Sequence, residues 1–128
     1  MNNEQLKKHG LEFLNYLNGY HIRLKEIHWN TTCKAEHLLT DDIDGGVLEY
    51  EDKLAENLMG CGDFRFEIDE LKTMLPSART LSEILKEMQS DVNGFQDKLD
   101  DKEHAGIINI LEDFTEDINK WKYLATFK

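Results

Sequence analysis

The chain has 128 residues, of which 40% are hydrophobic and 32% are charged, and its formal net charge is −11 at pH 7. This size and balance indicate one folded domain over residues 1–128 and exclude a disordered chain. No apolar run approaches the roughly 18 residues of a membrane span, and no signal-peptide pattern is present, so we expect a cytoplasmic protein. Cys33 and Cys61 fit a reduced compartment, and their spacing matches no zinc site.

The acidic charge also bears on partners. Phosphate binding needs clustered Lys and Arg, and the only adjacent basic pair near the amino end is Lys7 with Lys8. We therefore expect no DNA binding. An acidic surface instead attracts cations, or imitates DNA toward a DNA-binding partner.

Two long helices are predicted first along the chain. Apolar residues recur at steps of three, four and seven over residues 4–30, which predicts the first helix. Its stripe consists of Leu6, Phe13, Leu17, Tyr20, Leu24 and Ile27. A second helix is predicted over residues 33–59, with Thr31 or Thr32 as its cap and Gly60 and Gly62 at its end. Its apolar residues are Leu38, Leu39, Ile43, Val47, Leu48, Leu54, Ala55 and Leu58.

Two further helices follow a connection of about 20 residues that contains the only proline, Pro76. Thr80 and Glu83 form a capping box before the third helix, and Asp100 or Asp101 can cap the fourth. The apolar stripes of these helices are Leu81, Leu85, Met88, Val92, Phe95 and Leu99, then Ile107, Ile110, Leu111, Phe114, Ile118, Trp121 and Leu124. Strand patterns are absent. The sequence therefore predicts an all-α four-helix bundle with a long crossover between helices two and three.

Four metal-binding side chains share one face of the second helix. His37, Asp41, Asp52 and Glu56 lie at about 0°, 40°, 60° and 100° around the helix axis. Along the axis, however, Asp41 and Asp52 are about 16 Å apart, and His37 and Glu56 about 28 Å. Ligands of one metal ion lie within roughly 2 to 2.5 Å of it, so one helix cannot complete a site.

The spacing suggests how the site is completed. The pairs 37 with 56 and 41 with 52 share one midpoint, between Gly46 and Val47. Two copies of this helix that cross antiparallel there, about a two-fold axis, place His37 opposite the partner chain's residue 56. We expect Gly45 and Gly46 at the crossing, where missing side chains let two backbones approach closely. The alternatives are a solvated acidic face and a loop at the two glycines.

The same residues resemble a family. "HWN" at 28–30, then His37, Asp41, Asp52 and Glu56, look like the signature of the Dps or mini-ferritin family, the DNA-protecting ferritin-like proteins. "AENLMG" at 55–60 and "INKWKYLATF" at 118–127 are similar to the ends of that family's second and fourth helices. The resemblance covers nearly the whole chain.

The resemblance implies a ferritin-like bundle, a homo-oligomeric shell usually of twelve subunits, and a two-fold dimer through helix two. It implies a ferroxidase that oxidises Fe(II), preferably with hydrogen peroxide, and stores Fe(III) inside, so iron is the expected metal. Carried over, His28, His37 and Asp41 come from one subunit, and Asp52 and Glu56 come from its two-fold mate. Trp29 matches an aromatic residue beside that site. The nine-residue spacing of His28 and His37 is shorter than usual for the family, and the chain shows no basic tail for DNA.

Two rival interpretations belong to other classes. Residues 40–51, "TDDIDGGVLEYE", come near the pattern of a helix-loop-helix calcium loop. The third possibility is an acidic helical interaction protein without redox activity. For Cys33 we expect a buried, inert thiol.

Overall fold

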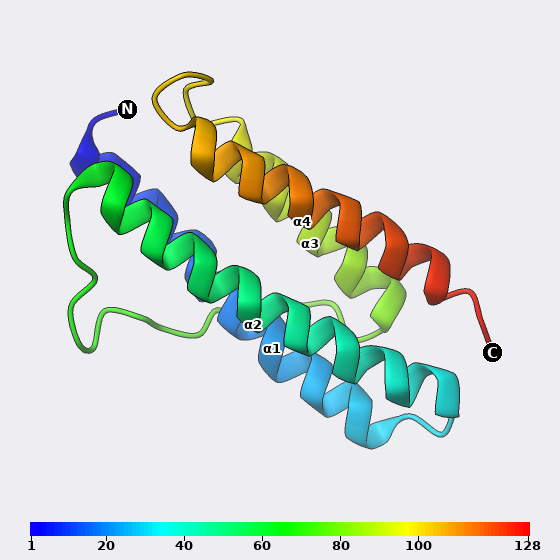
Figure 1. Ribbon diagram of the computed structural model, residues 1–128. Coiled ribbons are helices and arrows are strands. Elements are labelled where there is room, and N and C mark those ends of the chain that lie inside the picture. Colours follow the sequence, from blue (N-terminus) through cyan, green and yellow to red (C-terminus); the bar gives the residue numbers. More distant parts are fainter.

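The computed structural model describes residues 1–128 and contains four helices and no strand. The helices are α1 (Asn3–Asn30), α2 (Lys34–Gly62), α3 (Leu81–Gln96) and α4 (Ala105–Leu124). Figure 1 shows α1 beside α2 and α3 beside α4. The all-α four-helix prediction is confirmed, and the first two helices end within a few residues of the predicted positions.

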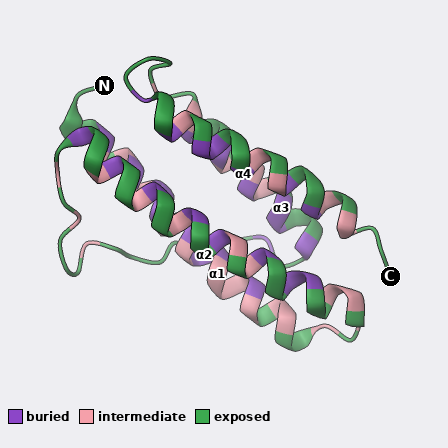
Figure 2. Ribbon diagram, viewed as in Figure 1, coloured by how far each residue is buried: buried purple, intermediate pink, exposed green.

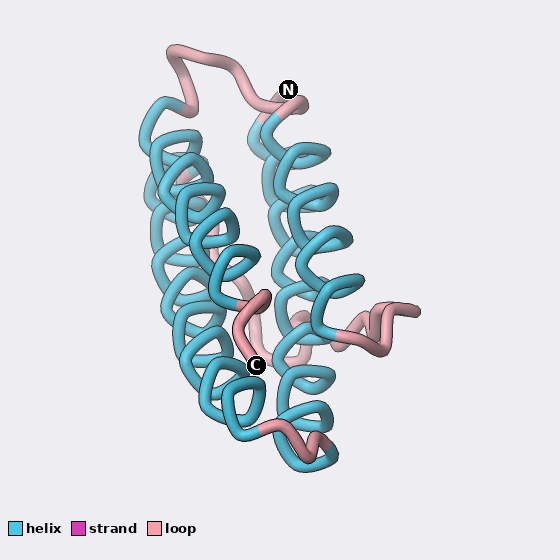
Figure 3. Tube along the Cα trace, turned by 90° about the vertical axis from the view of Figure 1, so that its right-hand side faces the viewer, coloured by secondary structure: helices cyan, strands magenta, loops and turns pink.

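The helices form a bundle in which neighbours run antiparallel. The main contacts join α1 with α2, α2 with α4, α4 with α3 and α3 with α1. Phe13 stacks on Phe95, while Tyr20 hydrogen-bonds to Asp91, so α1 and α3 run in opposite directions. Since α1 also pairs with α2 in a hairpin, α2 and α3 point the same way, and the chain between them must travel back along the bundle (Figure 3).

None of the helices carries a stretch that is long and apolar enough to span a membrane.

The expected helix caps are present only in part. The Thr80 hydroxyl accepts the Glu83 backbone N–H at 3.3 Å and so caps α3, but the reciprocal bond to the Glu83 side chain that would complete the predicted capping box does not form. The cap predicted for α2 is wrong, because the helix begins after Cys33 and no side chain caps it. The Thr31 hydroxyl instead accepts the Cys33 N–H.

The cap predicted for α4 is also wrong. Asp100 accepts the backbone N–H groups of Lys102 and Glu103, which orders the turn before the helix and lowers the pKa of Asp100. The helix itself begins after His104, whose buried ring accepts the Asp100 N–H.

One stripe of each helix faces a continuous apolar core (Figure 2). Members of the predicted stripes that are fully buried include Leu6, Leu17, Leu24, Ile43, Val47, Leu54, Leu58, Leu85, Met88, Val92, Ile107, Leu111, Phe114 and Ile118. Leu38 and Leu48 differ from the rest of their stripe, because they are 56% and 40% exposed. Both lie on the side of α2 that turns away from the bundle.

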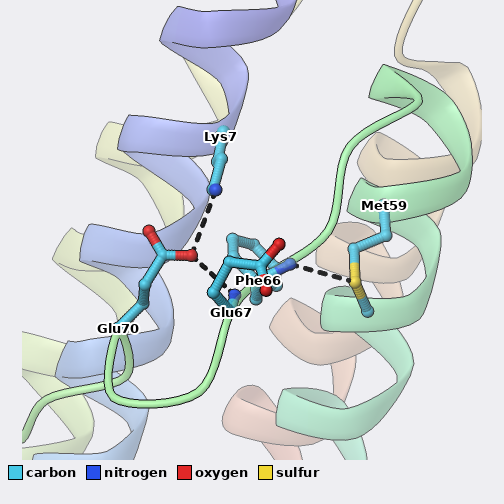
Figure 4. Close-up of polar contacts among 5 residues, drawn as sticks. All are labelled: Lys7, Met59, Phe66, Glu67 and Glu70. Atoms are coloured by element: carbon cyan, nitrogen blue, oxygen red, sulfur yellow. Dashed lines mark hydrogen bonds and ion pairs between the residues drawn. The ribbon is translucent and has the colours of Figure 1, made fainter.

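The connection between α2 and α3, residues 63–80, is fastened to the helices it passes. The Lys7 ammonium of α1 lies 3.1 Å from the Glu70 carboxylate, and the Phe66 N–H donates to the Met59 sulfur of α2 (Figure 4). Both contacts lie at the end of the bundle where α1 begins and α2 ends. The connection therefore starts by crossing from α2 to α1.

The later part of the connection runs along α1. The Met74 N–H donates to the Asn15 carbonyl, and the Arg23 side chain donates to the Pro76 carbonyl. Between these contacts the backbone presses against Gly19, where an alanine Cβ would lie 1.8 Å from the Met74 carbonyl oxygen. Only glycine fits at that position without moving the connection.

Helix α2 continues without a break through Gly45 and Gly46. A Cβ at Gly46 would lie 2.7 Å from the Trp121 ring of α4, so this glycine admits the indole of its own chain. The expectation that both glycines serve a crossing between chains is therefore wrong for Gly46. Gly45 faces away from the bundle, and a Cβ there would meet nothing within 4 Å. Residues 40–51 are helical throughout and do not form the loop that the calcium interpretation requires.

On its inward side α2 is tied to α4 by an aromatic contact. The Tyr50 ring stacks on Phe114 at 4.3 Å, and its hydroxyl donates to the Asp117 carboxylate at 2.5 Å. Burial, the hydrogen bond and the carboxylate charge all raise the pKa of Tyr50.

Candidate functional site

The α1–α2 hairpin brings His28 and His37 together. Only residues 31–33 separate the two helices, so the last turn of α1 lies beside the first turn of α2. The imidazole rings stack with their centroids 3.8 Å apart and their planes 14° from parallel. The nine-residue spacing therefore keeps His28 next to His37.

The two rings are held by reciprocal hydrogen bonds. The His28 Nδ1–H donates to the His37 carbonyl oxygen at 2.5 Å, and the His37 Nδ1–H donates to the His28 carbonyl oxygen at 2.7 Å. A carbonyl oxygen can only accept, so each Nδ1 must carry a proton. In the neutral rings the lone pair then lies on Nε2, which leaves both Nε2 atoms free to accept a hydrogen bond or to bind a metal ion.

Thr40 also helps to hold the His28 ring in place. Its side chain is fully buried, and its hydroxyl lies 3.3 Å from the His28 Nδ1. The same hydroxyl donates to the Glu36 carbonyl at 2.8 Å, so it accepts from His28. The His28 imidazole is thus held in one tautomer and one orientation by the His37 carbonyl and the Thr40 hydroxyl.

The three acidic candidates occupy the outward side of α2. Asp41, Asp52 and Glu56 are exposed. The ion pairs of the chain join Lys7 with Glu70, His21 with Asp44 and Arg23 with Glu26, and thus use none of the three. These carboxylates are unneutralised within the chain.

A single chain does not close a metal site. No group of three or more His, Cys, Asp or Glu side chains is arranged so that it could hold a metal ion. The structure brings His28 and His37 together, but Asp41 lies about 16 Å along α2 from Asp52, which is one turn from Glu56. Their grouping through a second chain stays a prediction.

Sequence reasoning missed a second contact between α1 and α2. The His21 Nδ1 lies 2.6 Å from the Asp44 carboxylate. Beside it, one carboxylate oxygen of Glu51 is buried without a hydrogen-bond partner. Burial raises the pKa of Glu51 most, His21 lowers it, and Asp44 and Asp52 raise it further. The sequence spacing indicates this contact. His21 lies seven residues before His28 in α1, and Asp44 lies seven residues after His37 in α2, so the antiparallel hairpin that pairs the histidines also pairs His21 with Asp44.

The surroundings of the histidine pair are open. Trp29 is 70% exposed, with the Lys25 ammonium 5.4 Å from its ring centroid. A cavity of about 800 Å³ lies between this end of the hairpin and the start of α3, where Arg79 and Thr80 line it. Cys33 is partly exposed, so the expectation of a buried thiol is wrong.

Comparison of the chain with protein-family models, with curated proteins and with solved structures gives no match.

Proposed function

We propose that the chain is a Dps-like ferroxidase that oxidises Fe(II) at a site shared between two chains. The observation that supports this most directly is the reciprocal hydrogen bonding of His28 and His37, which leaves two Nε2 lone pairs free at one end of α2. Imidazole and carboxylate ligands together suit Fe(II), and carboxylates retain the harder Fe(III).

The two-chain arrangement follows from the unbroken α2. Because the helix is continuous through Gly45 and Gly46, Asp41 and Asp52 remain about 16 Å apart and cannot share an ion within one chain. In the proposed dimer, His28, His37 and Asp41 of one chain meet residues 52 and 56 of the partner. Val47 lies inside the core, so Gly45 and Leu48 are the residues nearest the crossing on the outward side.

The proposed chemistry is a two-electron reduction of peroxide. Two Fe(II) ions each give one electron to one H₂O₂, which takes up two protons and leaves as two water molecules. The carboxylates hold the resulting Fe(III), and an oligomeric ferritin-like shell is the proposed place of storage. The long return connection between α2 and α3 is compatible with a ferritin-like bundle.

Complementation tests the shared site. One variant carries His37→Ala with Asp41→Ala, and a second carries Asp52→Ala with Glu56→Ala. Each alone has only broken sites and should be inactive in peroxide-driven Fe(II) oxidation. In a mixed dimer one of the two sites has all its ligands, so random co-refolding should restore about a quarter of the wild-type rate.

The control is a variant with all four substitutions, mixed with either parent. Its mixed dimers carry six substitutions in place of four, so mass spectrometry distinguishes them, and they contain no complete site. If the first mixture, with mixed dimers verified by mass spectrometry, is as inactive as this control, the shared site is refuted. The acidic interaction protein without redox activity would then be the better interpretation.

A further inference from the structure

The four helices form two hairpins, α1 with α2 and α3 with α4, and few polar side chains join one hairpin to the other (Figure 1). None of the ion pairs crosses between the hairpins. Two hydrogen bonds connect a helix of one hairpin to a helix of the other. Tyr20 of α1 donates to Asp91 of α3, and Tyr50 of α2 donates to Asp117 of α4, both at 2.5 Å. The two bonds have the same chemistry, so a difference between them must come from their surroundings.

Asp91 lies between two small cavities of about 190 and 170 Å³, and this region is the α1–α3 contact. The other titratable or charged side chains that line the two cavities are His9, Glu12, Tyr16 and Tyr20 of α1, Glu87 of α3, and Lys98 of the turn after α3. Neither α4 nor the connection, which reaches the first cavity, contributes a titratable group. No ion pair of the chain includes Asp91. Its negative charge is therefore buried without a counter-ion.

Glu87 lies one turn before Asp91 on α3 and lines the same cavity. One of its carboxylate oxygens accepts the Ser77 hydroxyl at 3.3 Å, while the other is buried and has no hydrogen-bond partner. A buried acceptor without a donor is costly, and two ionised carboxylates in one cavity repel each other. A proton on Asp91 removes one of the two charges and supplies an O–H group that can donate to the unpartnered oxygen. The arrangement therefore favours one proton in this cavity.

The pKa of Asp91 changes in the direction that this arrangement requires. Burial raises the pKa of the Asp91 carboxyl most, and the hydrogen bond from Tyr20 lowers it. The charges of Glu87 and Glu12 raise it further, so the net direction is upward from the ordinary value of 3.8. The folded chain thus binds this proton more tightly than the unfolded chain. Its contribution to stability is full below the ordinary value and is lost as the pH rises through the folded-state value.

We propose that the α1–α3 contact is a pH-sensitive connection between the two hairpins, which becomes stronger when Asp91 takes up a proton. Opening this contact returns Asp91 to water, so the ionised carboxylate favours the open contact and the protonated carboxyl favours the closed one. Near neutral pH the contact depends on the Tyr20 hydrogen bond and on apolar packing. In a mildly acidic medium the repulsion within the cavity is removed. This inference is independent of the proposed function, because neither Asp91 nor Glu87 is a proposed metal ligand.

Urea unfolding at pH 5, 6 and 7 tests the inference, with Asp91→Asn as the main variant. The amide has the shape of the protonated carboxyl without its charge, and it can accept from Tyr20 and donate to Glu87. At pH 7 its folded-to-unfolded ratio should exceed that of wild type by at least about threefold, and the excess should shrink towards pH 5. The pKa of Glu51 is also raised, so the difference between the two chains is the measure, and not the slope of either alone.

Glu87→Gln gives an independent check, because its amide offers Asp91 a donor and removes the repulsion. In ¹³C NMR spectra of wild type, the Asp91 carboxyl signal, which is absent in Asp91→Asn, should titrate above the ordinary value of 3.8. Glu87→Gln should move this titration to lower pH. The matched control is Asp117→Asn, which alters the same kind of hydrogen bond between α2 and α4. It should keep the wild-type dependence of stability on pH.

Three results would overturn the inference. The first is an Asp91 carboxyl that titrates at or below its ordinary value, and the second is an Asp91→Asn variant no more stable than wild type at pH 7. The third is an equal loss of pH dependence in Asp117→Asn, because net charge and not the α1–α3 contact would then set the stability. If circular dichroism shows that Asp91→Asn does not fold, the titration of Asp91 in wild type and in Glu87→Gln decides the question alone.

Discussion

The inward and outward sides of α2 differ in whether their residues have partners within the chain, although they belong to the same 29-residue helix. On the inward side every feature has a partner in the chain: Val47 and Leu54 are fully buried, Gly46 admits Trp121, and Tyr50 binds Asp117. On the outward side Leu38 and Leu48 are exposed, Gly45 faces open space, and Asp41 and Asp52 have no counter-ion. The contrast teaches that the inward side is explained by folding, whereas the outward side needs another reason.

The largest difference should appear on truncating the same residue type on each side. Leu54→Ala removes a fully buried side chain and should lower the free energy of unfolding by about 2 to 5 kcal/mol. Leu48→Ala removes a 40% exposed side chain and should change it by less than about 0.5 kcal/mol. Urea unfolding of both variants in EDTA measures this. Equal losses would show that Leu48 supports the monomer, and the contrast between the two sides would disappear.

Alanine substitutions at the two adjacent glycines should change the stability by intermediate amounts and in opposite directions. Gly46→Ala places a Cβ 2.7 Å from Trp121, so overpacking of about 1 to 3 kcal/mol should outweigh the helix propensity gained, which is about 1 kcal/mol. Gly45→Ala has no such clash and should stabilise the chain by up to about 1 kcal/mol. The measurement is the thermal midpoint of each variant. A destabilised Gly45→Ala would contradict the assignment of this residue to open space.

The smallest effect concerns Tyr50. Tyr50→Phe removes the hydrogen bond to Asp117 and should cost about 1 kcal/mol at neutral pH. The folded-state pKa of Tyr50 is raised above its ordinary value near 10, so the stability it contributes is full below that pH and is lost as the pH rises further. The variant should therefore lose stability less steeply above about pH 10. Urea midpoints between pH 8 and 11 would show it, and an unchanged slope would mean that Tyr50 ionises freely in the fold.

Much of the fold could be predicted because helical periodicity reports burial directly. The stripe that contains Leu17 and Leu24 lies in the core as expected. The caps at Thr31 and Asp100 were misassigned because a capping side chain is recognised by type, and the same types also order the turn just before a helix. Periodicity also grouped Leu48 with its buried neighbour Val47, although one residue further along turns the side chain by about 100° and carries it out of the core.

For the candidate site, the shared face of His37 and Asp41 could be predicted from spacing, but the locking of His28 could not. That locking depends on a carbonyl of the facing helix, which appears only when the hairpin is built. The role of Gly46 was misread for a related reason, because a glycine in a sequence does not say which neighbour it admits.

The unbroken course of α2 through residues 45 and 46 has a consequence for how this chain can change over evolution. A loop absorbs an inserted residue, whereas one residue added between Asp41 and Asp52 would turn everything beyond it by about 100° and shift it by about 1.5 Å. Substitutions along this stretch are thus open to natural selection one at a time, but changes of length are not. Sequences that descend from this one should differ in the residue types between positions 37 and 56 far more readily than in the number of residues there.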